Sequence, residues 1–369
     1  MTYAELIDIK TNLLCNGLNP TDTVKEIKRI QNPFDDPKTG NEGVFVILDN
    51  GKQKVNILVS VSHKFDKLSE YEIKNNNENT YNLFKNNQLL DCVVSIFDIP
   101  KWYDKESKTT TGKEMSKCFL HEGGHFLHQS YSGCELHKVN QGCGYCSKKK
   151  SRKIATPDEV AETVIRAYKE NSQYQVALGG GYTNNEQTYF EYFLQCVQKI
   201  REQNKLIPIW IEMIPPAIEQ IEKLINVGVT SFGFNIEIWD DEIRKEICPG
   251  KFRLRTKEEY LERMKFALKL LGKEKVGSVL IAGLESKEST KRGIDTLTDF
   301  GVHPCILPFK PWDKSLLKDK EHCSSELFYE LSEYAALKVA EKRLNLLSNQ
   351  GCMLCDCCTL IHDINKLNN

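Results

Sequence analysis

The stretch TPDEVAETVIRAYKENSQYQVALGGG, residues 156–181, carries the signals of one helix followed by one strand. Thr156 is a good N-cap residue, Pro157 occupies the first helical position, and acidic residues follow in the first turn, so a helix is expected to begin here. The apolar run QVAL then ends in three glycines, which is typical of a buried strand followed by a tight turn. The stretch therefore predicts one helix–strand unit of a parallel sheet.

The same alternation continues to residue 309. Further helices are expected at 185–204, 217–228, 256–272 and 286–301, and further strands at 207–216, 229–239, 275–284 and 303–309. Strands separated by helices of this length form parallel βα units. With one more strand just before Cys134, the chain has six units, which are too few for a closed eight-stranded barrel. The expected fold class is α/β, a partial (β/α)6 TIM-like barrel.

The regions on either side of the barrel have a different pattern. Residues 1–115 are expected to be a mixed α+β region that includes a hairpin at 44–60, in which Asn50-Gly51 forms a turn with positive φ at both positions. The Asn-rich stretch 69–88 is interpreted as a polar loop. A helix at 324–350 leads into a Cys-rich end. We therefore expect three segments, 1–115, 116–320 (the barrel) and 321–369.

Composition excludes several classes of protein. The 50 Lys and Arg residues balance 51 Asp and Glu residues, so no net field favours nucleic acid or an anionic membrane. No apolar run approaches the roughly 20 residues of a membrane span, and the N-terminal sequence lacks the pattern of a signal peptide. The expected location is cytoplasmic. There, the 14 cysteines of a large chain serve metal binding or catalysis rather than disulfides.

The cysteines fall into two groups and a scattered remainder. Cys134, Cys143 and Cys146 lie in the loop after the first barrel strand. Three thiolates do not complete a tetrahedral zinc site, but they can hold three irons of a [4Fe–4S] cluster and leave the fourth iron open for a substrate or cofactor. Most of the scattered cysteines are interpreted as small buried hydrophobes; they are Cys15, Cys92, Cys118, Cys196, Cys248, Cys305 and Cys323.

At this point the sequence resembles the radical S-adenosylmethionine (SAM) superfamily, in which a partial (β/α)6 barrel carries three cysteines after its first strand. Tyr145, just before the last cysteine, matches the family's aromatic position. The usual spacing is C-x3-C-x2-C, whereas this chain has C-x8-C-x2-C. The resemblance implies cleavage of SAM at the cluster to a 5′-deoxyadenosyl radical, which abstracts hydrogen from a small-molecule or peptide substrate.

Further positions resemble SAM-binding motifs of the family's biotin-synthase-like branch. Gly179, Gly180 and Gly181 are similar to the glycine motif at the SAM amino group, and Asn235 and Glu237 to the Asn-x-Asp that holds the ribose. Two residues apart on one strand, Asn235 and Glu237 are expected to share a face.

Two arginines and the ends of the fifth and sixth strands also resemble positions of the radical SAM family. Arg263 is similar to the arginine that pairs with the SAM carboxylate, with Arg255 as the second candidate. The fifth strand's VLIAGLE resembles the motif beside the adenine, and HPCILPFKP resembles the closing prolines of the sixth strand.

A different metal site competes for the same region. His121-Glu122-Gly123-Gly124-His125 fits the H-E-x-x-H pattern of a zinc hydrolase, which requires a helix. Two adjacent glycines cost roughly 1 kcal/mol each in a helix relative to alanine. We therefore favour a glycine-containing turn before the first barrel strand, and keep a zinc-binding protein as the alternative. His128 and His137 are expected near the cluster, where one of them could serve the substrate.

The C-terminal end carries a second dense group of thiols. Cys352, Cys355, Cys357 and Cys358 lie within seven residues. Because the adjacent Cys357 and Cys358 cannot easily bind one ion together, three of the four with a further ligand, such as Cys323, are the favoured set. An auxiliary iron–sulfur cluster, a structural zinc and reduced thiols all remain open.

The resemblance also implies an electron donor, flavodoxin or ferredoxin, both of which are acidic. The basic run SKKKSRK, residues 147–153, follows the cluster motif and is either a solvated surface or a steering patch for that donor. Nucleic acid would need a wider basic face than this composition supports.

Overall fold

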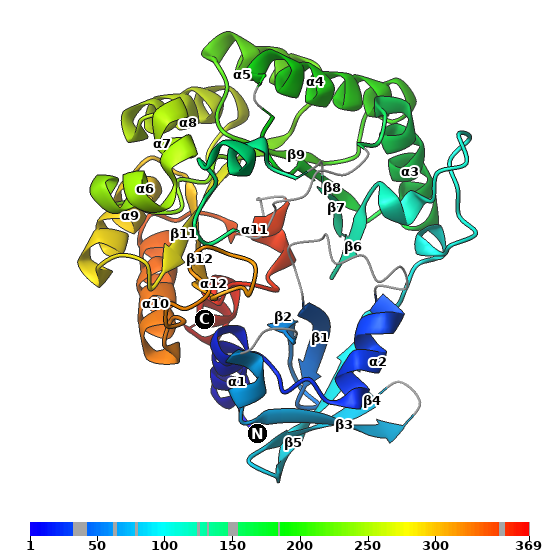
Figure 1. Ribbon diagram of the computed structural model, residues 1–369, viewed down its shortest axis with the longest axis vertical. Helices are drawn as coiled ribbons and strands as arrows, with labels where there is room; N and C mark the ends of the chain where they lie inside the picture. The colour runs from blue at the N-terminus through cyan, green and yellow to red at the C-terminus, as the bar shows by residue number, and fades with distance from the viewer. Residues whose placement is uncertain are drawn as a thin grey trace.

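The computed structural model describes residues 1–31, 43–61, 65–77, 80–123, 126–130, 133–146, 154–183, 185–346 and 351–368. Two sheets organise this part of the chain, one of five strands and one of seven. In Figure 1 the five-stranded sheet lies below the arc that the larger sheet and its helices form.

The larger sheet has the strand order β12-β11-β10-β9-β8-β7-β6. Neighbouring strands from β7 to β12 pair in parallel, whereas β6 pairs with β7 in the antiparallel direction. The strands are β6 Leu120–Glu122, β7 Phe126–Ser130, β8 Gln175–Gly179, β9 Ile209–Glu212, β10 Ser231–Gly233, β11 Val276–Ala282 and β12 His303–Pro308. These parallel strands confirm the predicted partial barrel of six units.

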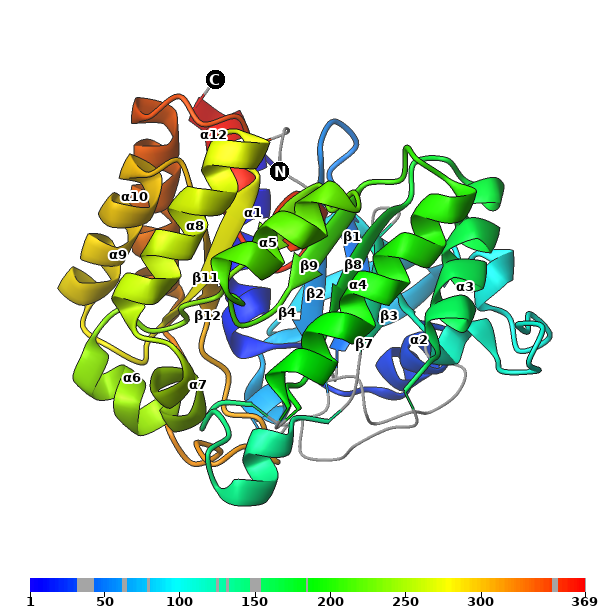
Figure 2. The same cartoon turned by 90° about the horizontal axis from the view of Figure 1, so that it is seen from above.

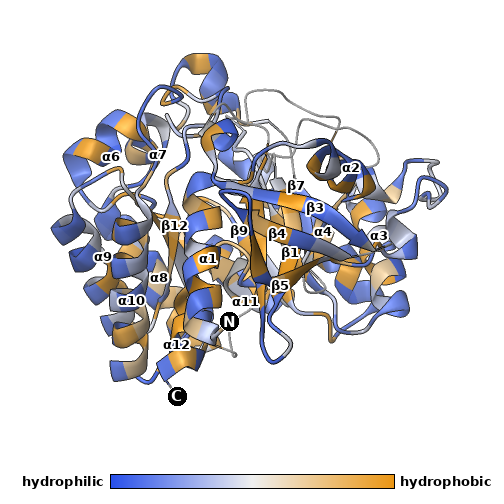
Figure 3. Cartoon of the chain, turned by 90° about the horizontal axis from the view of Figure 1, so that it is seen from below, coloured by the Kyte–Doolittle hydropathy of each residue, from blue (hydrophilic) through white to orange (hydrophobic). Residues whose placement is uncertain are grey.

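Helices follow the parallel strands and cover the outer face of this sheet (Figures 1 and 2). They are α3 Pro157–Glu170, α4 Glu186–Gln203, α5 Ile218–Asn226, α6 Asp241–Ile247, α7 Pro249–Leu254, α8 Lys257–Leu271 and α9 Lys287–Asp299. α3 begins where predicted, because Thr156 and Glu159 form a capping box around Pro157. In Figure 3 the strands are mainly hydrophobic and the outward helix faces mainly hydrophilic, so the core lies between the sheet and its helices.

The N-terminal sheet is antiparallel in the order β2-β1-β5-β4-β3. Its strands are β1 Gly43–Asp49, β2 Lys54–Ser60, β3 Tyr71–Asn77, β4 Thr80–Lys85 and β5 Gln88–Ile96, and α1 Tyr3–Asn16 and α2 Asp22–Gln31 precede them. α1 packs against β2, and α2 packs against β1 and β3. The predicted α+β character of this region is therefore present.

Two details of the N-terminal prediction were wrong. The 44–60 hairpin exists, but its loop has four residues, 50–53, and of Asn50 and Gly51 only Gly51 has positive φ. The Asn50 side chain accepts from the amide of Gln53 at 2.8 Å, which stabilises the longer turn. The expected loop 69–88 is instead the β3–β4 hairpin, because the apolar residues that alternate with polar ones, Tyr71 and Ile73 in β3 and Tyr81 and Leu83 in β4, are buried.

The C-terminal end returns to the middle of the molecule. α10 Ser325–Glu341 packs against α9 and β12, and α12 Ile361–Asn368 packs against α10 and α1. Between them lies the short helix α11 Cys352–Cys355, which Figure 1 shows in the opening of the barrel sheet. The Leu58 amide of β2 donates to the Cys357 carbonyl at 2.8 Å, so this segment contacts the N-terminal sheet as well.

In the part of the chain that the structure describes, no helix combines the length and apolar character needed to cross a membrane.

Candidate active site

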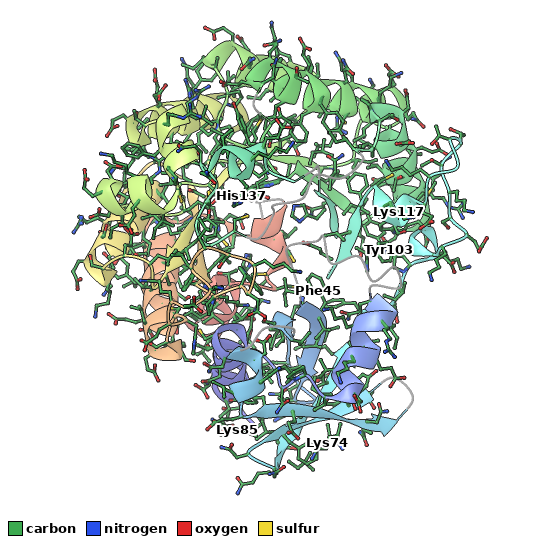
Figure 4. The ribbon with its side chains drawn as sticks, in the orientation of Figure 1. Phe45, Lys74, Lys85, Tyr103, Lys117 and His137 are labelled. Atoms are coloured by element: carbon green, nitrogen blue, oxygen red, sulfur yellow. The ribbon has the colours of Figure 1, made fainter. Side chains whose placement is uncertain are left out.

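The cluster loop, residues 133–146, follows β7 at the carboxyl edge of the parallel strands. Cys134 precedes a short 3-10 helix, Glu135–Val139, and the Cys146 amide donates to the Cys143 carbonyl at 3.1 Å in a turn. In Figure 4 His137 marks this loop, and Phe45 of β1 lies across from it on the N-terminal sheet. The structure thus places the three predicted cysteines in one loop at the edge where barrels of this kind carry their sites.

Backbone hydrogen bonds tie the cluster loop to three neighbouring segments. The Glu135 amide donates to the Tyr182 carbonyl at 2.8 Å, and the Gly144 amide donates to the Ile247 carbonyl at 2.7 Å. The Gly144 carbonyl accepts from the Leu316 amide at 2.8 Å. These partners follow β8, end α6 and follow β12, so the barrel determines where the loop lies.

The thiols of the loop lie in a shielded environment. Burial raises the pKa of Cys134. A hydrogen bond with the Cys248 thiol, together with burial, raises the pKa of Cys143 well above its ordinary value, whereas the Lys251 ammonium acts in the opposite direction. Among the described residues, no three Cys, His, Asp or Glu side chains converge as they do around one metal ion.

The contact between Cys248 and Cys143 was not predicted from the sequence. Cys248 lies at the junction of α6 and α7, fully buried, with its thiol beside Cys143. Sequence spacing carried no sign of this contact, because more than a hundred residues separate the two cysteines.

The predicted glycines lie directly against the cluster loop. A Cβ atom on Gly181 would lie 2.5 Å from the Cys134 amide nitrogen, closer than any side chain tolerates. Gly180 has φ of 137°, and a Cβ on Gly179 would lie 3.0 Å from the Glu212 Cβ. Glycine is therefore required at Gly181 for close approach and at Gly180 for its backbone conformation.

Asn235 lies beyond the end of β10 and links its neighbouring strands. Its side-chain amide donates to the Glu212 carboxylate of β9, and its side-chain oxygen accepts from the Val279 amide of β11 at 3.1 Å. The side chain is buried. In this arrangement Asn235 supports the sheet edge.

Glu237 has the left-handed backbone conformation, with φ of 74°. Its amide donates to the Val279 carbonyl at 2.9 Å and its carbonyl accepts from the Ile281 amide at 2.8 Å, so β11 holds it in this conformation. A non-glycine residue with positive φ is uncommon and is found often at functional sites. Because φ changes sign here, the simple alternation along a strand does not set the directions of Asn235 and Glu237.

Lys251 pairs with Glu237 and was not foreseen from the sequence. Its ammonium donates to the Glu237 carboxylate and to the Asn235 carbonyl at 3.4 Å. Burial opposes the charged lysine, but the Glu237 carboxylate holds the pKa of Lys251 well above its usual range. Lys251 therefore stays protonated.

The two candidate arginines meet at one carbonyl. Arg255 donates to the Pro215 carbonyl at 3.2 Å, and so does Arg263 at 3.2 Å. Arg255 also pairs with Glu186 and lines a small hollow with Tyr182, whereas Arg263 pairs with Glu259 on its own helix at 3.3 Å. Of the two, Arg255 lies next to the segment that follows the Gly179–Gly181 strand end.

The H-E-x-x-H stretch is not a helix in the structure. His121 and Glu122 belong to β6, the chain turns at Gly123, and β7 begins at Phe126. His125 lies outside the described residues. The ring of His121 packs among aromatic rings, with Trp102 and Tyr174 at centroid distances of 6.2 and 6.0 Å. The favoured turn before the first barrel strand is thus confirmed.

Glu122 instead joins a polar network inside the barrel. His128 Nδ1 lies 3.0 Å from Glu122 Oε1, and His128 Nε2 lies 3.7 Å from Glu212 Oε2. Glu212 in turn accepts from Asn235. His137 is placed differently, because its ring packs on Gly142 in the cluster loop.

The C-terminal thiols lie inside the opening of the barrel. The Cys355 thiol lies 3.9 Å from the Gly123 carbonyl, and a Cβ on Gly123 would lie 3.1 Å from Cys357 Sγ, so both thiols face the β6–β7 turn. Cys358 faces a cavity instead. Burial raises the pKa of Cys358 to about 12, with the Cys355 thiol contributing and Lys310 opposing. The Cys352 side chain lies outside the described part of the chain.

The further thiol near this group is Cys305 rather than Cys323. Cys305 of β12 is buried, and the charges of Cys358 and Cys355 add to burial in raising its pKa well above the ordinary value. Cys323 lies against Gly283, where its Cβ would be 3.0 Å from an added Cβ, and beside Cys15. Sequence spacing gave no reason to choose Cys305 over Cys323.

A cavity of about 220 Å³ connects the cluster loop to the C-terminal thiols. Tyr145 and Glu237 contribute to its lining. Burial, reinforced by the charges of Cys143 and Glu237, raises the pKa of Tyr145 well above its ordinary value, so the hydroxyl stays protonated. The remaining lining includes Leu58 and Ser60 of β2, Ile281 and Leu307 of the barrel, Lys310 and Trp312 after β12, and Cys358.

Residues 131–304 match the family model described as the radical SAM superfamily. The chain carries a radical SAM domain. The curled sheet of six parallel strands and the matched range, which contains all three cysteines of the cluster loop, agree with this assignment. The protein is thus an enzyme that contains a radical SAM domain.

Among curated proteins, this chain is similar to the bacteriochlorophyllide c C-7(1)-hydroxylase of Chlorobaculum limnaeum, with 24% identity over 210 residues. That match covers 50% of this chain and 52% of the hydroxylase, so it spans about half the length of each protein.

Solved structures with a similar course of the chain include a synthase and a methyltransferase. Methylornithine synthase has 17% identity and a TM-score of 0.49, covering 68% of this chain and 72% of the synthase. A radical SAM methyltransferase from Sphaerobacter thermophilus has 13% identity and a TM-score of 0.47, covering 74% of this chain and 76% of the methyltransferase.

Proposed function

We propose that this enzyme reductively cleaves SAM at a [4Fe–4S] cluster held by Cys134, Cys143 and Cys146, and that the resulting 5′-deoxyadenosyl radical abstracts hydrogen from a small-molecule or peptide substrate. The contact of Gly181 with the backbone of Cys134 carries the proposal, because it sets the glycine strand end against the cysteine loop. Three thiolates suit a cluster with one open iron. The chain's own part is to hold SAM, orient the substrate and exclude water.

The resemblance assigns SAM contacts to residues that surround this loop. The backbone of Gly179–Gly181 would accept the amino group, and Glu237 would accept hydrogen bonds from the ribose hydroxyls. For the carboxylate we favour Arg255 over Arg263, because Arg255 lines the hollow beside Tyr182, whose carbonyl binds the cluster loop. Asn235 would act by holding β9 and β11 in place.

The test uses anaerobic reconstitution with iron and sulfide. The wild-type protein should bind about four irons per chain at this site and release 5′-deoxyadenosine from SAM when it is reduced. A variant with alanine at Cys134, Cys143 and Cys146 should lose that iron, whereas Cys92→Ala, in the N-terminal sheet, should keep it. A triple variant with unchanged iron content would refute the assignment, and a colourless zinc-containing wild-type protein would favour the zinc alternative.

We also propose an auxiliary iron–sulfur cluster on Cys352, Cys355 and Cys357. The shared direction of Cys355 and Cys357 toward the β6–β7 turn supports this choice over Cys358, which faces the cavity. A hydrogen bond with Cys355 and burial raise the pKa of Cys357 well above its ordinary value, with the Lys10 ammonium opposing them, so a metal ligand at this position would have to displace the thiol proton.

Point variants are a better test of the auxiliary cluster than deletion of the C-terminal segment. Such a deletion would also remove Asp363 of α12, which forms a buried ion pair with Lys10. A Cys355→Ser/Cys357→Ser variant should lose iron and one reduced cluster signal in electron paramagnetic resonance while the first cluster stays. Cys323→Ser is the control. Unchanged iron in the double variant would contradict the proposal, and metal analysis would then separate zinc from reduced thiols.

Electron supply is proposed to come from an acidic flavodoxin or ferredoxin in the cytoplasm. The basic run 147–153 lies outside the described residues, so the proposal rests on the position of the cluster loop that precedes it. Adding flavodoxin or ferredoxin with its reductase should support 5′-deoxyadenosine formation, and the rate should fall as salt is raised. A rate that does not change with salt would speak against electrostatic steering.

A further inference from the structure

Three partly or fully buried lysines surround the proposed active site, and two of them have carboxylate partners. Lys251 pairs with Glu237, and Lys10 lies 2.6 Å from Asp363 Oδ2. The third, Lys310, lines the cavity of about 220 Å³. Across the described residues, no carboxylate oxygen lies within the 4.0 Å of an ion pair from the Lys310 ammonium.

The backbone holds Lys310 in a defined position. It follows β12, where the Phe309 amide donates to the Ala282 carbonyl at 2.9 Å and the Phe309 carbonyl accepts from the Cys323 amide at 3.0 Å. Its ammonium lies 5.8 Å from the centre of the Trp312 ring, and both residues line the cavity. Lys310 therefore presents its side-chain amine at a fixed place in the cavity wall, where burial lowers its pKa and the charges of Cys358, Cys15 and Asp66 act in the opposite direction.

Most of the remaining lining is apolar. Leu58, Ile281, Leu307 and Trp312 contribute side chains to the wall. The Glu237 carboxylate, which also lines the cavity, is already paired with Lys251. A partly desolvated ammonium in an apolar wall is costly unless an anion pairs with it, so the cavity is complementary to a molecule with one negative group and an apolar body.

We propose that Lys310 binds a carboxylate of the substrate, so that the enzyme acts on a small organic acid with an apolar part. This inference rests on the proposed function, because it takes the cavity between Tyr145 and Cys358 as the substrate site. A single ammonium matches the single charge of a carboxylate. A phosphate monoester carries nearly two charges and is usually bound by several donors, such as arginine forks or clustered amides.

The size of the cavity limits the substrate. Small-molecule pockets usually measure about 300–1,000 Å³, so about 220 Å³ suits a compact acid, or the acidic end of a longer molecule. In this pose the carboxylate lies at Lys310, and the apolar body extends toward Tyr145 and Glu237, where the SAM ribose is proposed to lie. The C–H bond to be attacked would then lie away from the carboxylate.

Matched acid and amide probes test this inference without knowledge of the natural substrate. Benzoate, phenylacetate and hexanoate are compared with their amides by calorimetric titration of reconstituted protein in the presence of SAM. Wild-type protein should bind at least one acid roughly tenfold or more tightly than its amide, as one charge-assisted hydrogen bond implies. Lys310→Met should remove that preference while amide affinity stays within about twofold, and Lys310→Arg should retain it.

Controls separate the possible failures. Lys223→Met on the exposed face of α5 should keep the acid preference, and circular dichroism should show that each variant is folded. Equal binding of acids and amides, no binding of any acid, or an acid preference that survives in Lys310→Met would overturn the inference. If wild-type protein holds its cluster and cleaves SAM but shows no acid preference, only the inference about Lys310 is contradicted. If the protein binds no iron, the proposed function is contradicted instead.

Discussion

Lys10 of α1 and Asp363 of α12 form a buried ion pair, with 2.6 Å between Lys10 Nζ and Asp363 Oδ2. The same ammonium donates to the Asp356 carbonyl at 2.6 Å, and the Tyr3 hydroxyl donates to Asp363 at 2.8 Å. The two ends of the chain are thus joined in the core, next to the Cys-rich segment. A buried charge whose partner is removed is expensive, so this pair connects folding to the position of the thiols.

Asp363→Asn should therefore lower the free energy of unfolding by about 3 kcal/mol, because the buried Lys10 keeps only the more distant Asp356 carboxylate, whose Oδ1 lies 3.7 Å from Lys10 Nζ. Urea unfolding of the metal-free protein measures this. Lys25→Ala, which breaks an exposed pair with Asp22, should leave stability nearly unchanged. Equal effects of the two variants would show that Lys10 is solvated in solution.

Gly181→Ala should reduce iron incorporation at the first cluster, because the added Cβ would lie 2.5 Å from the Cys134 amide nitrogen and would push the cluster loop away. Iron content and the visible absorption of reconstituted protein measure the loss. Gly272→Ala is the control, since its φ of 94° makes alanine strained there while no atom lies within 4 Å. Full iron loading of Gly181→Ala would mean that the loop position tolerates the shift.

Glu237→Gln should weaken SAM binding about tenfold or more while the cluster spectrum is kept, because a hydrogen bond to a charged group contributes about 1.5–3 kcal/mol. The variant also leaves Lys251 buried without a partner, which lowers stability by a separate mechanism. The double variant Glu237→Gln/Lys251→Met should regain stability but not SAM affinity. Recovery of both would show that Glu237 acts only through the ion pair.

Glu159 should make the protein sensitive to acid. Burial opposes its charge, but hydrogen bonds from Thr111 and the Thr156 amide and the Lys113 ammonium outweigh burial and lower the pKa of Glu159. A carboxyl whose folded pKa is depressed contributes stability that is fully present above its unfolded pKa of about 4.5 and is lost as pH falls through the lower folded value.

Replacing this residue isolates the effect. Glu159→Gln should destabilise by about 1 kcal/mol or more at pH 7, and the difference from wild type should shrink below about pH 4.5. Urea unfolding of the metal-free protein at pH 7, 5 and 4 checks both the size and the direction. A difference that grows on acidification would contradict the assignment.

Local sequence predicted the barrel well, because each of its units carries its own signals. The capping box at Thr156 and the apolar runs before Gly179 and Gly228 specify helices and strands without distant contacts. The same reasoning failed at 69–88, where asparagine content outweighed the alternation of Tyr71 and Ile73 with polar residues. The division into segments 1–115, 116–320 and 321–369 stays a prediction.

The candidate site was only partly predictable. The spacing of Cys134, Cys143 and Cys146 indicated a cluster loop, and topology placed that loop at the carboxyl edge of the strands. Lys251 beside Glu237 and Cys248 beside Cys143 follow from helix packing over large sequence separations, so no local pattern identifies them.

The sequence by itself determined the number and order of the barrel units and the loop that carries three thiols, because helix and strand signals act over a few residues. Only the tertiary structure decided which charges face which thiols. The pairing of Lys10 with Asp363 and the position of Lys310 in the cavity wall depend on where the two ends of the chain meet the barrel. Those contacts form when burial of apolar surface brings distant segments together, and burial energy is not specific to any local pattern.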